Sequence, residues 1–151
     1  KSEKDWLSRE LQKWIPSHEF LERGMALHEA QFATEYLFEG KIEAILRRAY
    51  PENELAFVKD LKSITTERNK AMVVNFTQNY ALKRPFKKHG EPHYSVVAGY
   101  NSKTKLVLLA DVDPEIEKPY SISLKRLFAS MAFINPAVGI PRGWLILTHR
   151  K

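Results

Sequence analysis

The stretch Tyr94-Ser95-Val96-Val97-Ala98-Gly99-Tyr100 decides the fold, together with Leu106-Val107-Leu108-Leu109-Ala110, which follows it along the chain. Short apolar runs of this kind, bounded by turn residues, are typical of buried strands. The residues between them, Asn101-Ser102-Lys103-Thr104, form a tight polar turn. The sequence therefore predicts a β-hairpin, and the other elements are placed relative to it.

Apolar spacing and capping residues predict the elements on either side of the hairpin. Helices are expected at Trp6–Trp14, at Met25–Phe38 and at Pro51–Thr66, the last with Leu55, Val58, Leu61 and Ile64 on one face. Strands are expected at Lys41–Leu46, Ala71–Phe76 and Gly143–Thr148, and Ser123 caps a helix that runs through Met131. Helices first and an antiparallel sheet later indicate the α+β class, with N-terminal helices packed on a C-terminal sheet.

Composition excludes several classes of protein. The 151 residues suit one domain, and 44% hydrophobic residues with eight Phe, six Tyr and three Trp exclude a disordered chain. No apolar run approaches the roughly 20 residues of a membrane-spanning helix, so no membrane partner is expected. Cysteine is absent, which excludes a disulfide framework, thiolate zinc sites and a cysteine nucleophile supplied by these residues.

The net charge of +6 raises the question of an anionic partner. Acidic residues interleave with the basic ones, which is typical of a solvated surface, so a nucleic-acid partner is not expected. The densest basic stretch is Lys83–Lys88, and its neighbours Tyr80 and Phe86 keep an RNA-binding loop open as an alternative. A basic loop just before His93 also suits the steering of an anionic peptide.

One polar pair is brought together by the predicted hairpin. A two-residue turn places His93 opposite Val112, and a three-residue turn places it opposite Asp111. In either register the His93 and Asp111 side chains lie within about 5 to 8 Å at Cβ. A carboxylate that accepts the ring N–H fixes the histidine tautomer and prepares the ring to take a proton from a nucleophile. The alternative is that both residues only close the strand ends.

The two histidines in the stretch His89–His93 raise a metal site as an alternative interpretation. His89, Glu91 and His93 offer two imidazoles and a carboxylate, but Gly90 and Pro92 preclude the helix on which zinc proteases carry such a pair. Neither a cysteine nor a convincing third ligand is nearby. We therefore expect no metal ligands in this chain.

Five blocks of the sequence resemble the phytochelatin synthase family in the same order. They are Arg23–Leu27, Met72–Phe76, Glu91–Asn101, Leu108–Val112 and Arg142–Leu147. The third is similar to the family's Gly-His-(Phe/Ile)-Ser-Pro-x-x-x-Tyr-Asn segment, and the fourth to its Leu-Ile-x-Asp-Val strand. The spacing from His93 to Asp111 equals the family's His-to-Asp spacing, and the resemblance covers roughly 14–148.

The resemblance implies a papain-like fold and a Cys–His–Asp triad, in which His93 is the general base and Asp111 its orienting acid. The family transfers a γ-glutamylcysteinyl group from one glutathione to another and releases glycine, and some relatives hydrolyse glutathione instead. The implied substrate is therefore glutathione or another γ-glutamyl peptide. No tightly bound cofactor is implied, although heavy-metal ions are expected as metal–thiolate complexes of glutathione.

Three departures from the family shape the expectations. The family's cysteine lies on a helix upstream of Lys1, so 1–151 is expected to be a single catalytic domain that is incomplete at its N-terminus and inactive alone. Such a domain is expected to associate with the missing segment or with itself. The segment Asp113–Glu117 is acidic where the family is rich in Arg and Tyr, and the Cys-rich C-terminal region of eukaryotic members is absent. A non-catalytic relative that binds a peptide or a partner protein stays open as an alternative.

Overall fold

The computed structural model describes residues 24–85, 91–113 and 115–151. Its helices are α3 (Leu27–Leu37), α4 (Glu54–Thr66), α5 (Gln78–Ala81) and α6 (Leu124–Met131), and a 3-10 turn, η1 (Pro51–Asn53), precedes α4. Its strands are β1 (Ile42–Arg48), β2 (Lys70–Thr77), β3 (Pro92–Asn101), β4 (Leu106–Asp111), β5 (Tyr120–Ser123), β6 (Ile134–Asn135), β7 (Ile140–Pro141) and β8 (Gly143–His149). The expected helix at Trp6–Trp14 lies outside the described residues.

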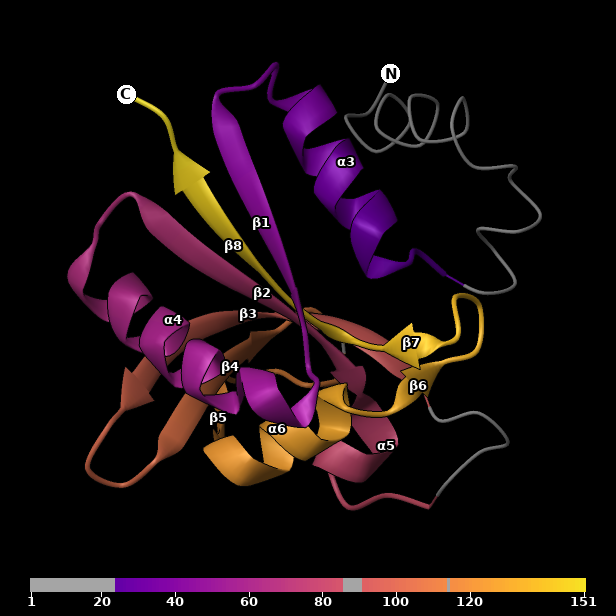
Figure 1. Ribbon diagram of the computed structural model, residues 1–151. Coiled ribbons are helices and arrows are strands. Elements are labelled where there is room, and N and C mark those ends of the chain that lie inside the picture. The colour runs from indigo at the N-terminus through magenta and orange to yellow at the C-terminus, as the bar shows by residue number, and fades with distance from the viewer. Residues whose placement is uncertain (1–23, 86–90, 114) are drawn as a thin grey trace.

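A six-stranded antiparallel sheet forms the centre of the domain, with strand order β1-β8-β2-β3-β4-β5 (Figure 1). The C-terminal strand β8 lies between β1 and β2 and pairs with both along most of its length. This insertion ties the two ends of the described chain into one sheet. The α+β expectation is confirmed, since helices precede most of an antiparallel sheet.

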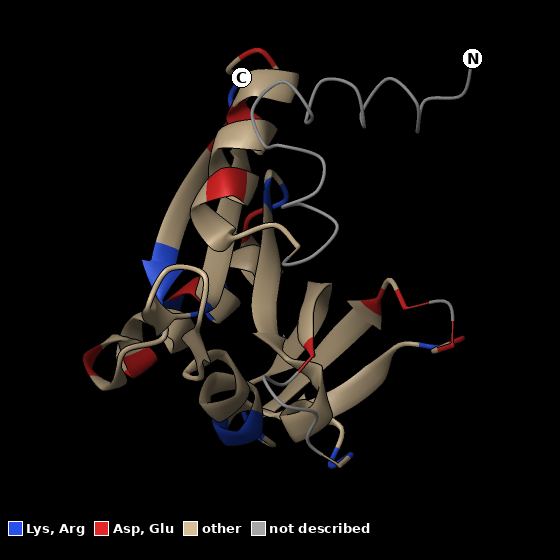
Figure 2. Ribbon diagram, turned by 90° about the vertical axis from the view of Figure 1, so that its right-hand side faces the viewer, with Lys and Arg blue, Asp and Glu red and all other residues tan. Residues whose placement is uncertain are grey.

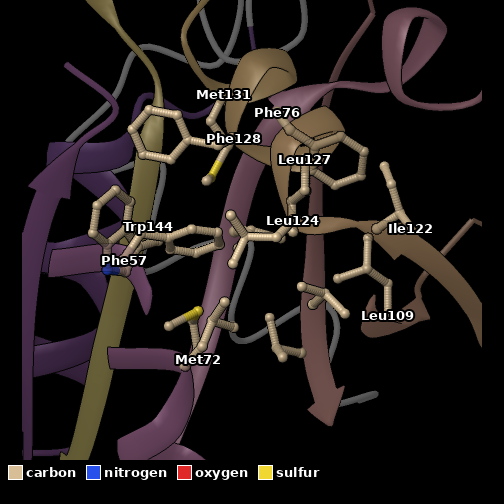
Figure 3. Packing of buried hydrophobic residues seen from close by; sticks show 14 of the residues in the cluster. Phe57, Met72, Phe76, Leu109, Ile122, Leu124, Leu127, Phe128, Met131 and Trp144 are labelled. Atoms are coloured by element: carbon tan, nitrogen blue, oxygen red, sulfur yellow. The ribbon is translucent and has the colours of Figure 1, made fainter. Parts of the chain in front are cut away.

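The main core lies where α4 and α6 pack against the sheet (Figure 3). Phe57 of α4 packs against Trp144 of β8 and Phe128 of α6, with ring centroids 4.8 and 5.8 Å apart. Phe57 and Leu61 are fully buried, whereas Leu55 is 83% exposed. The buried stripe of α4 is therefore centred on Phe57 and Leu61, and the expectation that Leu55 belongs to it is wrong.

Helix α3 lies beside β1 and β8, apart from α4 and α6 (Figure 1). Its side chains serve the edge strand β1: the Gln31 amide donates to the Ala44 carbonyl at 2.7 Å, and the Ala44 N–H donates to Glu35 Oε1 at 3.1 Å. An edge strand with unpaired backbone groups invites pairing with other chains. These two hydrogen bonds satisfy the backbone N–H and carbonyl of Ala44, near the middle of the edge strand β1.

Close packing explains Gly143, the first residue of β8, and Arg142 just before it. A Cβ atom on Gly143 would lie 2.0 Å from the carbonyl oxygen of Arg47, so any side chain there would collide with the β1 backbone. The buried Arg142 donates through Nη1 to the carbonyls of Phe133 and Ile134, at 3.2 and 3.3 Å. Gly143 thus admits β1 next to β8, and Arg142 holds the segment that leads into β6.

The β3–β4 hairpin forms as predicted, but in a different register. Asn101 pairs with Leu106, which leaves a four-residue connection, and the register shifts by one residue between Val97 and Gly99. Beyond this bulge Ser95 lies opposite Asp111. Both predicted partners of His93, Val112 and Asp111, are therefore wrong as direct cross-strand pairs.

The bulge lies in β3 and therefore decides which face of the sheet His93 occupies, whereas Asp111 stands on the regular strand β4. Without it, the pairing of Asn101 with Leu106 would place Asp111 opposite Val96, and His93 would lie on the other face. A one-residue slip turns every following side chain to the other face. With the bulge, Asp111 faces the same side as Ser95, and His93 lies two residues from Ser95 on that side.

Candidate active site

His93 and Asp111 meet at the end of the sheet as diagonal neighbours on β3 and β4. Diagonal neighbours in an antiparallel pair are within reach of long side chains. His93 Nε2 forms a short hydrogen bond with Asp111 Oδ1, so the expectation that the two side chains are in contact is confirmed. The Asp111 side chain is fully buried, while the His93 side chain is 17% exposed. The carboxylate is thus enclosed, and the imidazole reaches the surface.

Three donors surround the Asp111 carboxylate. Oδ1 accepts from His93 Nε2 and from the Asp113 N–H at 2.9 Å, and Oδ2 accepts from the Tyr120 hydroxyl at 2.8 Å. Burial alone would raise the pKa of Asp111, but the Asp113 N–H, the His93 ring and the Tyr120 hydroxyl outweigh it and hold that pKa below its ordinary value. Asp111 is therefore ionised at neutral pH and acts as an acceptor.

The His93 ring is held in one orientation by its neighbours. The ring meets Phe76 edge-on, with centroids 5.7 Å apart, and its backbone carbonyl accepts from the Asn75 amide at 3.2 Å. Because Nε2 faces a carboxylate, the neutral ring carries its proton on Nε2 and leaves Nδ1 as the basic atom. Among the described residues, none forms a hydrogen bond with Nδ1. The arrangement presents a base to any acid placed beside Nδ1.

The acidic segment after β4 begins with a residue that has a structural role. Asp113 accepts through Oδ1 from the Glu115 N–H at 2.9 Å and through Oδ2 from the Gln78 amide at 3.1 Å. The Glu115 N–H and the Gln78 amide lower the pKa of Asp113. Gln78 in turn donates its backbone N–H to the carbonyl of Glu91 at 2.8 Å. Asp113 and Gln78 together fix the loops on both sides of the His93–Asp111 pair.

Part of the basic stretch lies in the described chain, and part of it does not. Lys83 and Arg84 are exposed, whereas 86–90, including the candidate ligand His89, lies outside the described residues. Arg126 of α6 anchors the start of the stretch by donating to the Tyr80 carbonyl at 2.6 Å and the Ala81 carbonyl at 3.1 Å. Lys and Arg elsewhere are interspersed with Asp and Glu over the elements (Figure 2).

The described residues carry neither a metal-ligand cluster nor a membrane-spanning helix. Within 24–85, 91–113 and 115–151, no three His, Asp or Glu side chains are grouped so that they could hold a metal ion. Over the same residues, none of the helices is long and apolar enough to cross a membrane.

Sequence reasoning missed Tyr120 and Gln78 as members of the site. Tyr120 belongs to β5, a strand of four residues that directly precedes α6 and carries too few residues for an alternating pattern to show. Gln78 belongs to α5, which is also only four residues long. A signal for the bulge was present, because an isolated glycine in a strand pattern, here Gly99, often marks one.

Comparisons with known proteins connect this geometry to a family. The chain is 32% identical over 91 residues to a glutathione gamma-glutamylcysteinyltransferase of Schizosaccharomyces pombe, which covers 60% of the chain and 21% of that protein. It is 34% identical over 65 residues to glutathione gamma-glutamylcysteinyltransferase 3 of Lotus japonicus (43% of the chain, 14% of that protein). It is 32% identical over 68 residues to glutathione gamma-glutamylcysteinyltransferase 1 of Arabidopsis thaliana (44% of the chain, 14% of that protein).

The chain thus spans about a fifth or less of the length of these curated relatives. The sequence model of the phytochelatin synthase family matches a far larger share of the chain, residues 3–144. That match includes all five blocks except the last three residues of the final one, and it includes both members of the His93–Asp111 pair. The chain belongs to the phytochelatin synthase family.

Proposed function

We propose that this chain supplies the general base and the orienting acid of a thiol acyl-transfer enzyme that acts on glutathione or another γ-glutamyl peptide. One observation carries the proposal: His93 Nε2 is bonded to a buried, ionised carboxylate, and Nδ1 is left as a base. The names of the relatives, glutathione gamma-glutamylcysteinyltransferases, support this class of substrate. Membership of the family also supports a papain-like arrangement of the domain.

The nucleophile in this proposal is a cysteine outside the 151 residues, which contain none. Its thiol gives a proton to His93 Nδ1, and Asp111 stabilises the imidazolium that forms. The thiolate then attacks the carbonyl carbon of the cysteinyl–glycine bond. His93 returns the proton to the leaving amine, so that glycine departs and a γ-glutamylcysteinyl thioester remains on the enzyme.

A second acceptor completes the reaction and determines its class. Attack by the amine of another glutathione gives the elongated peptide, and attack by water gives hydrolysis. In both cases His93 takes a proton from the acceptor and returns it to the cysteine sulfur, which restores the enzyme. The exposed carboxylates of Glu115 and Glu117 lie beyond Asp113, and they would disfavour a substrate carboxylate near this loop. Peptides with fewer carboxylates than glutathione are therefore included in the proposed substrate class.

A role in binding alone is the second candidate. The observation that favours it is the absence of cysteine from the 151 residues, since the fold can persist and bind a peptide without a nucleophile. The two candidates differ in whether the buried Asp111 matters for turnover or only for stability.

Release of glycine from glutathione tests the proposal. We expect release by the full-length protein that contains this chain, a loss of at least about 10³-fold in His93→Ala, and none from the 151 residues alone. His149→Ala is the matched control, because His149 is exposed at the end of β8 beside the start of β2, whereas His93 pairs with Phe76 near the other end of β2. Equal rates for the wild-type and His93→Ala proteins would remove His93 from the mechanism, and turnover by the cysteine-free chain would refute a thiol mechanism.

A further inference from the structure

We infer that Tyr120 is a positioning residue for the His93–Asp111 pair: its hydroxyl fixes the Asp111 carboxylate so that Oδ1 faces His93 Nε2. The inference rests on the proposed function only for its effect on turnover. The hydrogen bond itself, from the Tyr120 hydroxyl to Asp111 Oδ2 at 2.8 Å, is a feature of the fold.

Three neighbouring strands converge on Asp111. Ser95 of β3 lies directly opposite Asp111, and His93 is the diagonal neighbour on that strand. On the other side, Tyr120 of β5 lies opposite Leu109 and is therefore the diagonal neighbour from β5. The registers of β3 and β5 thus bring one donor to each carboxylate oxygen from opposite sides.

This geometry restricts rotation of the carboxylate. A carboxylate held by one oxygen alone can turn about its terminal bond, because that torsion is broad and roughly two-fold. Here the Asp113 N–H and His93 hold Oδ1 while Tyr120 holds Oδ2, so a turn would break bonds at both oxygens. Burial, together with the adjacent Asp111 carboxylate, raises the pKa of Tyr120 far above its ordinary value. Tyr120 therefore keeps its proton and donates at every pH at which the pair works.

Tyr120 also draws charge from the carboxylate that faces the imidazole. Removing its hydroxyl concentrates negative charge on Oδ1, the oxygen that His93 Nε2 faces. Within the described residues, the other ionisable groups whose charge acts on this cluster are Asp113, on the loop after β4, and Arg84, which acts on Tyr120 from the loop after α5. Both stay unchanged in a Tyr120→Phe protein, so the comparison isolates the hydroxyl.

The test uses the 151-residue chain labelled on its histidines and followed by NMR at neutral pH. In Tyr120→Phe we expect the Nε2 proton of His93 to exchange faster with water, because the Asp111 carboxylate is then free to turn away from it. Tyr100→Phe is the matched control: Tyr100 is also packed against the core, but its buried hydroxyl has no hydrogen-bond partner among the described residues. We expect no change in His93 there.

A purely structural role for Tyr120 would lower the melting temperature without moving the His93 signals. A Tyr120→Phe protein that is folded, with the His93 signals and Nε2 proton exchange of the wild-type chain, would therefore overturn the inference. Asp111→Asn shows that the method detects the pair, since a neutral amide accepts a hydrogen bond more weakly than a carboxylate and the Nε2 proton should exchange faster.

Turnover by the full-length protein gives a second, independent test of the inference. In the full-length protein we expect Tyr120→Phe to lower kcat about tenfold, or about 1.4 kcal/mol, with KM within about twofold. An unchanged kcat would count against an effect of positioning on the reaction. If His93→Ala leaves turnover intact while Tyr120→Phe still speeds the exchange of the His93 Nε2 proton, the proposed function fails and the positioning role stands.

Discussion

Removal of the Asp111 side chain should destabilise the domain more than loss of its charge. Asp111→Ala leaves three donors without their acceptor: the His93 ring, the Asp113 N–H and the Tyr120 hydroxyl. An unsatisfied buried donor costs about 1–3 kcal/mol. All three donors belong to half-buried residues, so water can satisfy part of what the carboxylate leaves unpaired. We expect a loss of about 2–5 kcal/mol, a large part of a total stability that is about 5–15 kcal/mol for a typical domain.

Asp111→Asn separates hydrogen bonding from charge. The amide keeps an oxygen where Oδ1 lies, and the Tyr120 hydroxyl can turn to accept from the new NH2 group. We therefore expect a loss of only about 1–2 kcal/mol.

Urea unfolding of the 151-residue chain, followed by tryptophan fluorescence, measures both losses. The matched control is Ser95→Ala, because Ser95 is buried directly opposite Asp111 and its hydroxyl has no hydrogen-bond partner in the part of the chain that the structure describes. It should cost less than about 1 kcal/mol. Equal stabilities of Asp111→Ala and Ser95→Ala would refute the reasoning, since the carboxylate would then not be satisfying these donors.

Three further predictions concern pH, packing and charge. Because Asp111 has a folded pKa below its unfolded value, its contribution is present above about pH 4 and is lost as pH falls through the folded pKa. The stability advantage of the wild-type chain over Asp111→Asn, measured by urea unfolding, should therefore shrink on acidification, and a constant difference would contradict this. Gly143→Ala should cost at least about 2 kcal/mol in the same assay. Gly99→Ala, whose new Cβ would meet only Leu108 Cβ at 3.8 Å, should cost less. Reversing the exposed charges of Lys83 and Arg84 to Glu should raise KM for an anionic peptide at low salt, and the difference should vanish at high salt; a salt-independent KM would exclude steering.

Local patterns predicted most of the fold. The hairpin, the strand at Gly143–Thr148 and the helix capped by Ser123 all depend on short segments whose signals are contained within them. The Ser123 hydroxyl indeed accepts from the Arg126 N–H at 3.2 Å. The position of β8 between β1 and β2 depends instead on tertiary pairing, which apolar periodicity does not encode.

The candidate site was predicted in part. His93 and Asp111 were recognised as a pair although both proposed registers were wrong, because diagonal neighbours reach one another as well as direct ones. In a regular hairpin with this turn, His93 and Asp111 would lie on opposite faces of the sheet. The bulge beside Gly99 places them on the same face. The role of Tyr120 could not be predicted from the sequence. Its contact with Asp111 requires β5 to pair with β4, and the segment between these strands has no regular spacing that would indicate this pairing.

The most direct test of the central claim is the rate at which the acyl-enzyme forms. Mass spectrometry of the full-length protein, quenched at successive times after mixing with glutathione, detects a γ-glutamylcysteinyl adduct on its cysteine. If His93 activates that thiol, His93→Ala should form the adduct at least about 10³-fold more slowly than the wild-type protein, whereas His149→Ala should match the wild-type rate. Adduct formation by His93→Ala at the wild-type rate would contradict the account.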